Sequence, residues 1–226
     1  MIKNILKIIA IFIIGITGGI FSNRIFFYEQ RPIYLTEKKE IIIQENLALK
    51  NAIEKVEKIV IGVKTQKKDK KILEGSALIL TSDGLIITLS ELIPPDSNFN
   101  FFLEGEKVPF QIIKRDLKEN LALIKIEKNN LPIAGFANLE KLKLGERVFL
   151  VGATFEKESF KKIVNEGIIR AFNKEIIETT IFEKNNLAGS PLFDIEGKIL
   201  GLNKIDKEEG RVITISISKI KSFANL

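Results

Sequence analysis

The stretch whose residue types and spacing suit chemistry runs from Asn185 to Asn203 and reads NNLAGSPLFDIEGKILGLN. A short polar loop leads into Gly189-Ser190-Pro191, and apolar residues then alternate around a turn at 194–197. Such alternation across a glycine-containing turn is typical of a β-hairpin. A loop that feeds a hairpin can point consecutive backbone N–H groups toward a ligand or a reacting carbonyl. The candidate binding loop consists of Asn186, Leu187, Ala188, Gly189 and Ser190.

The composition excludes several chemistries. The 226 residues contain no histidine and no cysteine. Without cysteine there is no disulfide and no thiolate nucleophile or ligand. Without histidine there is no imidazole base near neutral pH, and the commonest metal ligand is missing. Ser-His-Asp and Cys-His mechanisms are therefore excluded.

Other side chains offer weaker candidates. Ser216/Lys219 and Ser218/Lys221 have S-x-x-K spacing. A lysine-rich chain produces this spacing readily by chance, so we interpret them as strand and surface residues. Glu91 and the nearest acidic residues give no recognisable metal-ligand pattern. We predict no cofactor and no metal.

The chain is basic, with a formal charge of +6 and a pI of about 9.3. Such a charge suits nucleic acid or an anionic membrane surface. Most basic residues are spread along the chain and mixed with glutamate, and the one dense run is Lys-Lys-Asp-Lys-Lys at 67–71. We interpret this run as a solvated surface loop. No binding signature with interleaved aromatic residues occurs, so we predict no nucleic-acid partner.

Residues 1–28 are predicted to form an N-terminal transmembrane anchor. The segment from Ile8 to Phe21 carries no charge, and a helix from Ile5 to Phe21 just suffices for a thinned bilayer. A cleaved signal peptide is the alternative, but no clear A-x-A site follows the apolar run. An uncleaved signal anchor predicts a single-pass cell-membrane protein whose C-terminal domain is extracytoplasmic.

Residues 29–58 are predicted to form a linker and an amphipathic helix. Thr36 suits an N-cap, and Ile42, Leu49 and Val56 are spaced by seven. This spacing fits a short coiled-coil stalk that oligomerises the protein. It also fits a helix that packs on its own domain.

From Ile59 onward, short segments rich in Ile, Val, Leu and Phe are separated by turn residues. Many short strands at this spacing predict an all-β sandwich or barrel rather than βαβ units. The predicted strands are 59–64, 76–80, 85–89, 99–103, 108–114, 121–127, 147–151, 162–170, 175–178, 198–202 and 211–217. They fit two small β-barrels, residues 59–132 and 133–226, that join near Asn129–Gly135.

Several segments, in order, resemble the HtrA/Deg-type trypsin-like serine proteases. The loop and hairpin at 185–203 are similar to the family's GNSGGPL and the VIGIN strand that follows it. Residues 75–88 are similar to GSGVIID…DGYILT, and residues 114–126 to GRDPKTDLALLKI. The resemblance covers about 45–226. It implies the two-barrel trypsin/chymotrypsin-like fold.

The resemblance also places the family's catalytic positions. The serine position holds Ala188, the histidine position Glu91 and the aspartate position Asn120. Asn186 stands at the oxyanion glycine and Ser190 replaces a second glycine, so 186–190 becomes the peptide and oxyanion loop. Alanine has no oxygen to attack a carbonyl, and Glu91 has only water to activate. We therefore expect a degenerate member without catalytic residues and predict that the chain is not an enzyme.

The predicted function is that of a membrane-anchored pseudoprotease. Its cleft would bind extended or unfolded peptide segments by β-augmentation. Its role would be regulation or quality control, with an active HtrA-type protease or a second copy as possible partners, and we expect no PDZ domain. One alternative is a residually active serine-type hydrolase with a nucleophile outside the family pattern. Another is a structural or assembly protein that reuses the fold.

Overall fold

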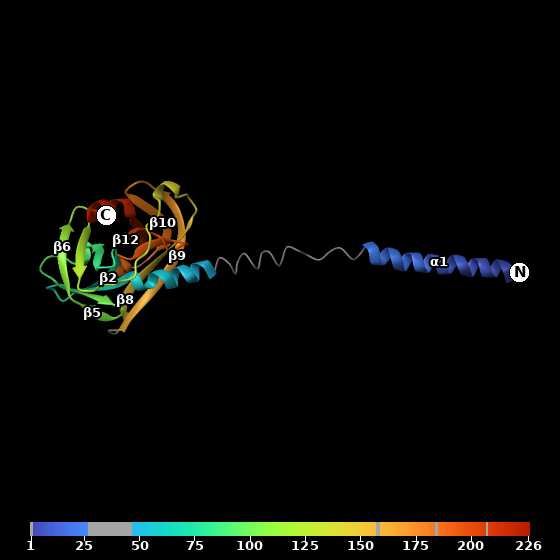
Figure 1. The fold of residues 1–226 in the computed structure, drawn as a ribbon, viewed down its shortest axis with the longest axis horizontal. Helices are drawn as coiled ribbons and strands as arrows, with labels where there is room; N and C mark the ends of the chain where they lie inside the picture. The colour runs from blue at the N-terminus through green and yellow to red at the C-terminus, as the bar shows by residue number, and fades with distance from the viewer. Residues whose placement is uncertain (1, 27–46, 157–158, 184, 207) are drawn as a thin grey trace. The chain divides into compact units, whose positions relative to one another are not determined.

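The structure is a computed structural model of the chain, shown in Figure 1. It describes residues 2–26, 47–156, 159–183, 185–206 and 208–226. These belong to two compact units, Met1–Glu45 and Asn46–Leu226. The second unit contains the sheets and the candidate site.

The described part of the first unit is helix α1, Ile2–Phe26. Within the described residues, no helix is both long and apolar enough to cross a membrane. The transmembrane span and signal anchor predicted over 1–28 are not found among these residues. Residues 1, 27 and 28 of the predicted anchor lie outside the described residues.

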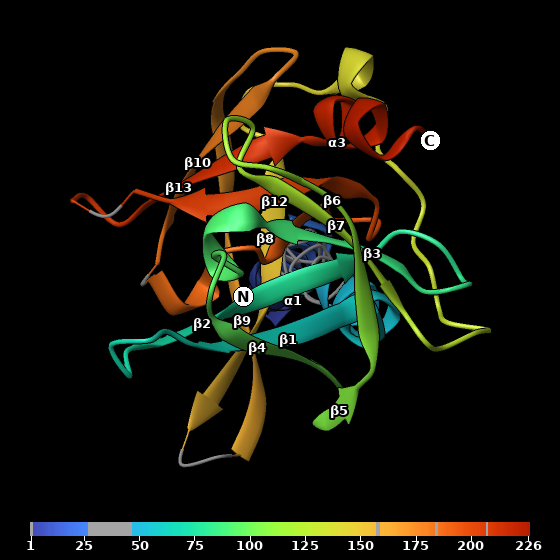
Figure 2. The ribbon, with the colours of Figure 1, turned by 90° about the vertical axis from the view of Figure 1, so that its left-hand side faces the viewer.

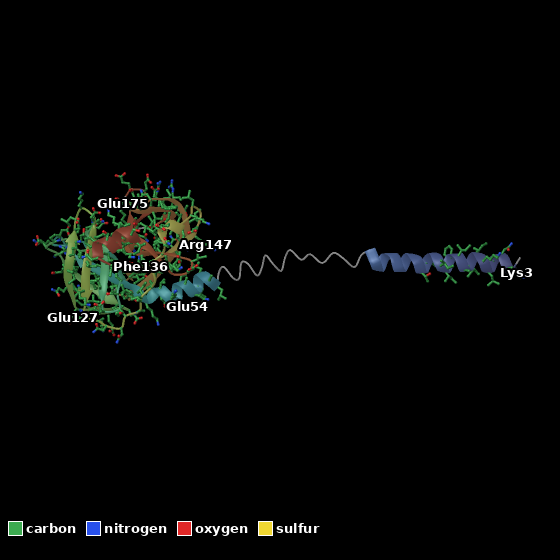
Figure 3. The ribbon with its side chains drawn as sticks, turned by 45° about the horizontal axis from the view of Figure 1, so that its top comes forward. Lys3, Glu54, Glu127, Phe136, Arg147 and Glu175 are labelled. Atoms are coloured by element: carbon green, nitrogen blue, oxygen red, sulfur yellow. The ribbon has the colours of Figure 1, made fainter. Side chains whose placement is uncertain are left out.

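A helix over residues 47–56, drawn in cyan in Figure 1, opens the second unit. It continues into a 3₁₀ turn at Glu57–Ile59. Ala52 and Val56 are four positions apart and buried in the main core, whereas Glu54, labelled in Figure 3, is exposed. The buried residues lie on one side of the helix, and this side packs against its own domain. Residues 36–46 of the predicted coiled-coil stalk lie outside the described residues.

The first sheet is barrel-like and has seven strands among the described residues. The strands are β1 Val60–Gln66, β2 Ile72–Ile79, β3 Leu85–Leu89, β4 Asn98–Leu103, β5 Glu106–Val108, β6 Phe110–Asp116 and β7 Leu121–Ile126. Their order is β5-β4-β1-β2-β3-β7-β6, so β5 and β6 are the edges. β1 and β2 pair antiparallel from Val60↔Leu78 to Gln66↔Ile72.

The remaining strands form a closed barrel in the order β10-β13-β12-β11-β8-β9. They are β8 Arg147–Glu156, β9 Ser159–Phe172, β10 Ile176–Phe182, β11 Pro191–Asp194, β12 Ile199–Ile205 and β13 Arg211–Ser216. The hairpin predicted after the binding loop is present as β11 and β12. At its turn, Asp194 accepts hydrogen bonds from the N–H groups of Glu196 and Lys198, both 2.9 Å long.

The chain ends in a helix, which the strand pattern did not predict. Helix α3 spans Ile217–Ala224, and Ser216 caps it by accepting a hydrogen bond from Lys219 N–H. The predicted last strand ran through Ile217 and is therefore one residue too long. Ile217, Ile220 and Phe223 are buried at a spacing of three, which is a helical period.

Both sheets contribute to one core. Strand β8 contributes side chains on both of its faces. Phe149 and Val151 pack in the main core, whereas Val148 and Leu150 pack inside the closed barrel. Successive side chains of a strand point to opposite faces, so β8 is buried on both. Figure 2 shows β2 and β3 of the first sheet beside β8 and β12 of the barrel.

Candidate functional site

The predicted binding loop is a 3₁₀ turn, Asn185–Leu187, followed by Ala188, Gly189 and Ser190. Its backbone is fastened to β12. Gly189 N–H donates to the Asn203 carbonyl at 2.8 Å, and Asn203 N–H donates to the Ser190 carbonyl at 2.8 Å. The loop therefore has a fixed position on the closed barrel.

The same loop also lies against the first sheet at very short range. Ser76 N–H in β2 donates to the Ala188 carbonyl at 2.9 Å. A Cβ added to Gly75 would lie 2.6 Å from that carbonyl oxygen, and one added to Gly189 would lie 2.2 Å from the Ser76 carbonyl oxygen. Only glycine fits at these two positions, because no side chain tolerates such approaches to backbone.

Ser76 joins three segments at this junction. Besides its bond to the loop, its Oγ accepts from Ala153 N–H of β8 at 2.8 Å. Its carbonyl accepts from Thr88 Oγ1 of β3 at 2.7 Å. Ser76 is fully buried, and each of these bonds satisfies a polar group that water cannot reach. Ser76 was not predicted as a site residue, although a serine within an apolar strand is a usable signal.

Three residues of the predicted loop serve its structure. Leu187 is buried and lies close to Gly152, and Gly189 has a φ of 78°. Ser190 is fully buried, and its Oγ accepts from Asn203 Nδ2 at 3.1 Å. Ser190 is therefore a partner of β12 rather than a group that faces the cleft.

Glu91 and Asn120, far apart in sequence, meet in the structure. Asn120 Oδ1 accepts from Glu91 N–H at 2.9 Å and from Ser90 Oγ at 3.2 Å. Asn120 Nδ2 donates to Glu91 Oε1 at 3.1 Å. An amide can bind both groups because it is a donor and an acceptor. An aspartate there would place a second carboxylate against Glu91.

Glu91, Asn186 and Ala188 line one cavity of about 540 Å³. Glu91 and Ala188, at the family's histidine and serine positions, therefore line the same cavity. Asn120, at the aspartate position, is hydrogen-bonded to Glu91. Asn186 Nδ2 donates to Thr154 Oγ1 at 3.2 Å. The other lining residues are Lys67, Lys71, Ile72, Leu73, Glu74, Leu92 and Ile205.

The lysine run at 67–71 contributes to the cavity, which was not predicted from its sequence. The run forms the turn between β1 and β2, where Lys67 N–H donates to the Lys71 carbonyl at 2.9 Å. The loop is solvated as predicted, since residues 68–71 are exposed, but Lys67 and Lys71 also line the cavity. No signal in the sequence marks this, because the turn reaches the cavity only through the pairing of its strands.

One free strand edge borders the cavity at β12. β12 pairs with β13 from Gly201 to Ile205 but with β11 only from Ile199 to Leu202. The Asn203 backbone bonds to the binding loop, on the side away from β13. Bonding sides alternate along an antiparallel strand. The N–H and C=O of Ile205 therefore also face away from β13, where no described strand pairs with them.

A second free edge borders the same cavity at β2. This strand pairs with β1 from Ile72 to Leu78 but with β3 only from Ala77 to Ile79. Ser76 N–H bonds to the loop on the side away from β1. By the same alternation, Glu74 and Ile72 present their N–H and C=O groups on that side. No described strand covers this part of β2.

The S-x-x-K pairs lie elsewhere. Ser216 Oγ donates to the Lys174 carbonyl at 2.6 Å. Lys219 forms ion pairs with Glu119 and Glu175. The hydrogen bond that Lys219 donates to Glu119 raises the pKa of Lys219, so this lysine stays protonated and is a poor base. Ser218 and Lys221 line a different cavity beside Phe136. Within the described chain, no group of three or more acidic residues could hold a metal ion.

Comparisons with known proteins bear on the family and the fold of this chain. Residues 75–202 match the trypsin-like peptidase domain family. "Probable periplasmic serine endoprotease DegP-like" of Hahella chejuensis is 29% identical over 138 residues, covering 57% of this chain and 29% of that protein. "Serine protease HTRA1" of Xenopus laevis is 28% identical over 171 residues, covering 70% of this chain and 37% of that protein. The chain therefore spans well under half the length of these relatives.

The fold is also found in a solved structure, "HtrA-type protease AlgWS227A with tripeptide". It aligns with a TM-score of 0.68 at 21% identity, covering 78% of this chain and 62% of that chain. This likeness concerns the fold.

The comparisons correct one prediction. The sequence analysis predicts that the chain is not an enzyme, whereas its curated relatives are named serine endoproteases and a serine protease, which points to protease activity. The prediction rested on Glu91, Asn120 and Ala188. Substitution there excludes the Ser-His-Asp mechanism but says nothing of hydrolysis by other groups.

Proposed function

Because this chain belongs to the trypsin-like peptidase domain family and is similar to DegP-like and HTRA1 proteases, we propose that the cavity between its sheets binds extended peptide segments. Proteases act on peptide chains, and a protein of the same fold is named with a tripeptide. A regulatory or quality-control role, with an active HtrA-type protease or a second copy as partner, belongs to the same proposal.

The observation that carries the proposal is the pair of free strand edges around one cavity. Ile205 of β12 and Ile72 and Glu74 of β2 all line it, and their backbone groups face away from the neighbouring strands. An extended peptide offers N–H and C=O groups at alternate residues and can add to such edges as a further strand. Ala188 lies between the edges, since its carbonyl bonds to β2 and the next two residues bond to β12.

Alternate N-methylation of the peptide tests this proposal. A fluorescein-labelled decapeptide with apolar residues at alternate positions is titrated with the full chain, and anisotropy is recorded. Methylation of the amides that face the edges is expected to weaken binding by roughly tenfold or more, because each lost hydrogen bond contributes about 1 kcal/mol. The control is the same peptide methylated in the opposite phase. Equal binding of both methylated peptides contradicts strand addition.

The second candidate function is hydrolysis by groups outside the family positions, and the relatives' names favour it. Ala188 offers no nucleophilic atom. Of the nearby groups, Glu91 lines the cavity whereas Ser90 is only 2% exposed. A carboxylate can accept a proton from water. A water activated by Glu91 is therefore the candidate nucleophile for this activity.

Cleavage of an unfolded protein substrate separates the possibilities. Hydrolysis by the full chain that disappears in Glu91→Ala and survives in Ser90→Ala supports the water mechanism, and survival in both variants rejects it. The variant Glu91→His/Asn120→Asp/Ala188→Ser restores the family's residue types. Cleavage by this variant alone supports a peptide cleft that is intact and lacks only its nucleophile.

We also propose that the domain works outside the cytoplasm. The support is the word "periplasmic" in the names of several relatives. Fractionation of cells that produce the full chain tests the proposal. Recovery of the chain with cytoplasmic markers contradicts it.

A further inference from the structure

We propose that the cleft prefers peptides with carboxylates at the C-terminal end of the bound segment, and that Lys67 and Lys71 recognise them. This inference rests on the proposed binding of extended peptides. It adds a chemical class of ligand.

The direction follows from how the two free edges run. β12 leaves the binding loop at Asn203 and continues to Ile205, whereas β2 runs from Ile72 toward the loop at Ser76. A peptide antiparallel to β12 therefore approaches the loop. When it continues past Ala188, it runs from Ser76 toward Ile72, which is again antiparallel. Antiparallel pairing is the more stable arrangement, so one chain direction satisfies both edges.

This direction brings the C-terminal end of the peptide to the turn between β1 and β2. Lys71 is four residues from Gly75, which adjoins the Ala188 carbonyl. Four residues of strand span about 13 Å. The third or fourth residue beyond Ala188 therefore reaches Lys71, within the cavity that both residues line.

Lys67 and Lys71 form a positive site because of how the turn is built. Lys67 comes directly after Gln66 and Lys71 directly before Ile72, the last pair of the two strands. The two lysines are joined by the hydrogen bond from Lys67 N–H to the Lys71 carbonyl. Residues directly opposite one another share a face, and like charges there repel. Their neighbour Lys68 forms an ion pair with Asp96 at 3.4 Å. Among the described residues, Lys67 and Lys71 have no ion-pair partner, so an anionic ligand relieves the repulsion.

The two carboxylates of the cavity are engaged elsewhere. Glu74 Oε2 accepts from Phe155 N–H at 3.2 Å and from Thr154 Oγ1 at 3.3 Å. Its side chain also alternates to the opposite face of β2 from Lys71. Glu91 accepts from Asn120 Nδ2, and the next residue, Leu92, lies close to Gly75. Glu91 is therefore toward the Ala188 end, away from the lysines.

The test compares four labelled decapeptides on the full chain. Their apolar positions are identical. One has three glutamates at its C-terminal end, one has glutamines there, one has the glutamates at its N-terminal end, and one has C-terminal glutamates with an amidated C-terminus. The first is expected to bind roughly five- to tenfold more tightly than the glutamine peptide, since exposed charge pairs contribute up to about 1 kcal/mol each. The preference is expected to fall in 0.5 M salt.

A matched pair of variants locates the recognition. Lys67→Gln/Lys71→Gln is expected to abolish the preference and leave binding of the glutamine peptide unchanged. Lys68→Gln/Lys70→Gln removes the same charge from the same turn and is expected to keep the preference. Equally tight binding of the amidated peptide shows that the glutamate side chains suffice, and weaker binding shows that the C-terminal carboxylate contributes as well; both support the lysine site.

Three results overturn the inference. They are equal binding of the glutamate and glutamine peptides, tighter binding of the peptide with N-terminal glutamates, and equal loss in both double variants. In each of these the peptides still bind, so the proposed function stands without the acidic preference. Failure of all four peptides to bind rejects the proposed function and the inference together.

Discussion

At the scale of single residues, Asn120 decides what the centre of the cleft holds. Its φ of 53° lies in the left-handed region, which asparagine tolerates better than most residues. Its amide then binds both the backbone and the carboxylate of Glu91. Asn120 thus adopts the left-handed backbone conformation and also orients the Glu91 carboxylate.

Asp83 gives a prediction for pH. Its carboxylate is hydrogen-bonded to Lys125 Nζ at 2.5 Å and to the Thr81 hydroxyl. The Lys125 bond, followed by the Thr81 bond, lowers the pKa of Asp83 from 3.8 to about 2. A pKa that is lower in the folded state stabilises the fold above the unfolded pKa, and the contribution is lost as pH falls through the folded pKa. Asp83→Asn is therefore expected to reduce stability at pH 7 slightly, with the difference disappearing between about pH 4 and pH 2.

Carboxyl-carbon NMR titration and urea unfolding measure these two effects. Lys125→Gln is the control variant, and it is expected to return the Asp83 midpoint toward 3.8. A midpoint near 3.8 in the wild type contradicts the prediction. So does a stability difference that stays constant from pH 7 to pH 2.

At the scale of elements, the binding loop depends on its close approach to β2. Gly189→Ala places a Cβ 2.2 Å from the Ser76 carbonyl oxygen at a φ of 78°. The loop must move, so we expect a loss of more than about 3 kcal/mol in the free energy of unfolding. Peptide binding is expected to disappear with it. Urea unfolding and anisotropy measure the two effects.

Gly145→Ala is the matched control for this prediction. Gly145 has a φ of 81°, yet no atom lies within 4 Å of an added Cβ. Its substitution is expected to cost about 1 kcal/mol from backbone strain alone. Peptide binding is expected to persist. Equal costs for the two variants would show that the contact with β2 adds nothing.

At the scale of the whole molecule, the two sheets share the main core, and the closed barrel also encloses a smaller cluster of its own. Phe149, Phe193 and Leu202 of the closed barrel pack in the same buried cluster as Ile87 and Phe101 of the first sheet. Separation of the sheets would expose these side chains, and each buried large apolar side chain contributes about 1.5–3 kcal/mol. Neither half is therefore expected to be stable alone.

Expression of residues 46–132 and 133–226 as separate chains checks this expectation. Each is expected to give the narrow NMR dispersion of an unfolded chain. The full chain is expected to unfold in one transition that near-UV and far-UV circular dichroism report alike. A folded half, or two separate transitions, contradicts the shared core.

The strands and the hairpin could be predicted because their signals are local. Alternation around the turn at 194–197 gave β11 and β12, and apolar runs between turn residues gave most other strands. Helix α3 was missed because its cap, Ser216, ends a strand pattern, and its helical spacing occupies only Ile217–Ala224. A membrane-spanning helix was predicted over 1–28 from its apolar content, and among the described residues no helix is long and apolar enough to cross a membrane.

The sequence by itself determined the chemistry that is absent from the cleft, since no fold can create a histidine, a cysteine or an oxygen on Ala188. It also determined the order of the loop and hairpin, because neighbouring residues specify them. Only the tertiary structure decided that Glu91 meets Asn120, that Lys67 and Lys71 line the cavity, and that β2 and β12 keep free edges there. These depend on which strands pair and how far, and that extent is fixed by packing between residues distant in the chain.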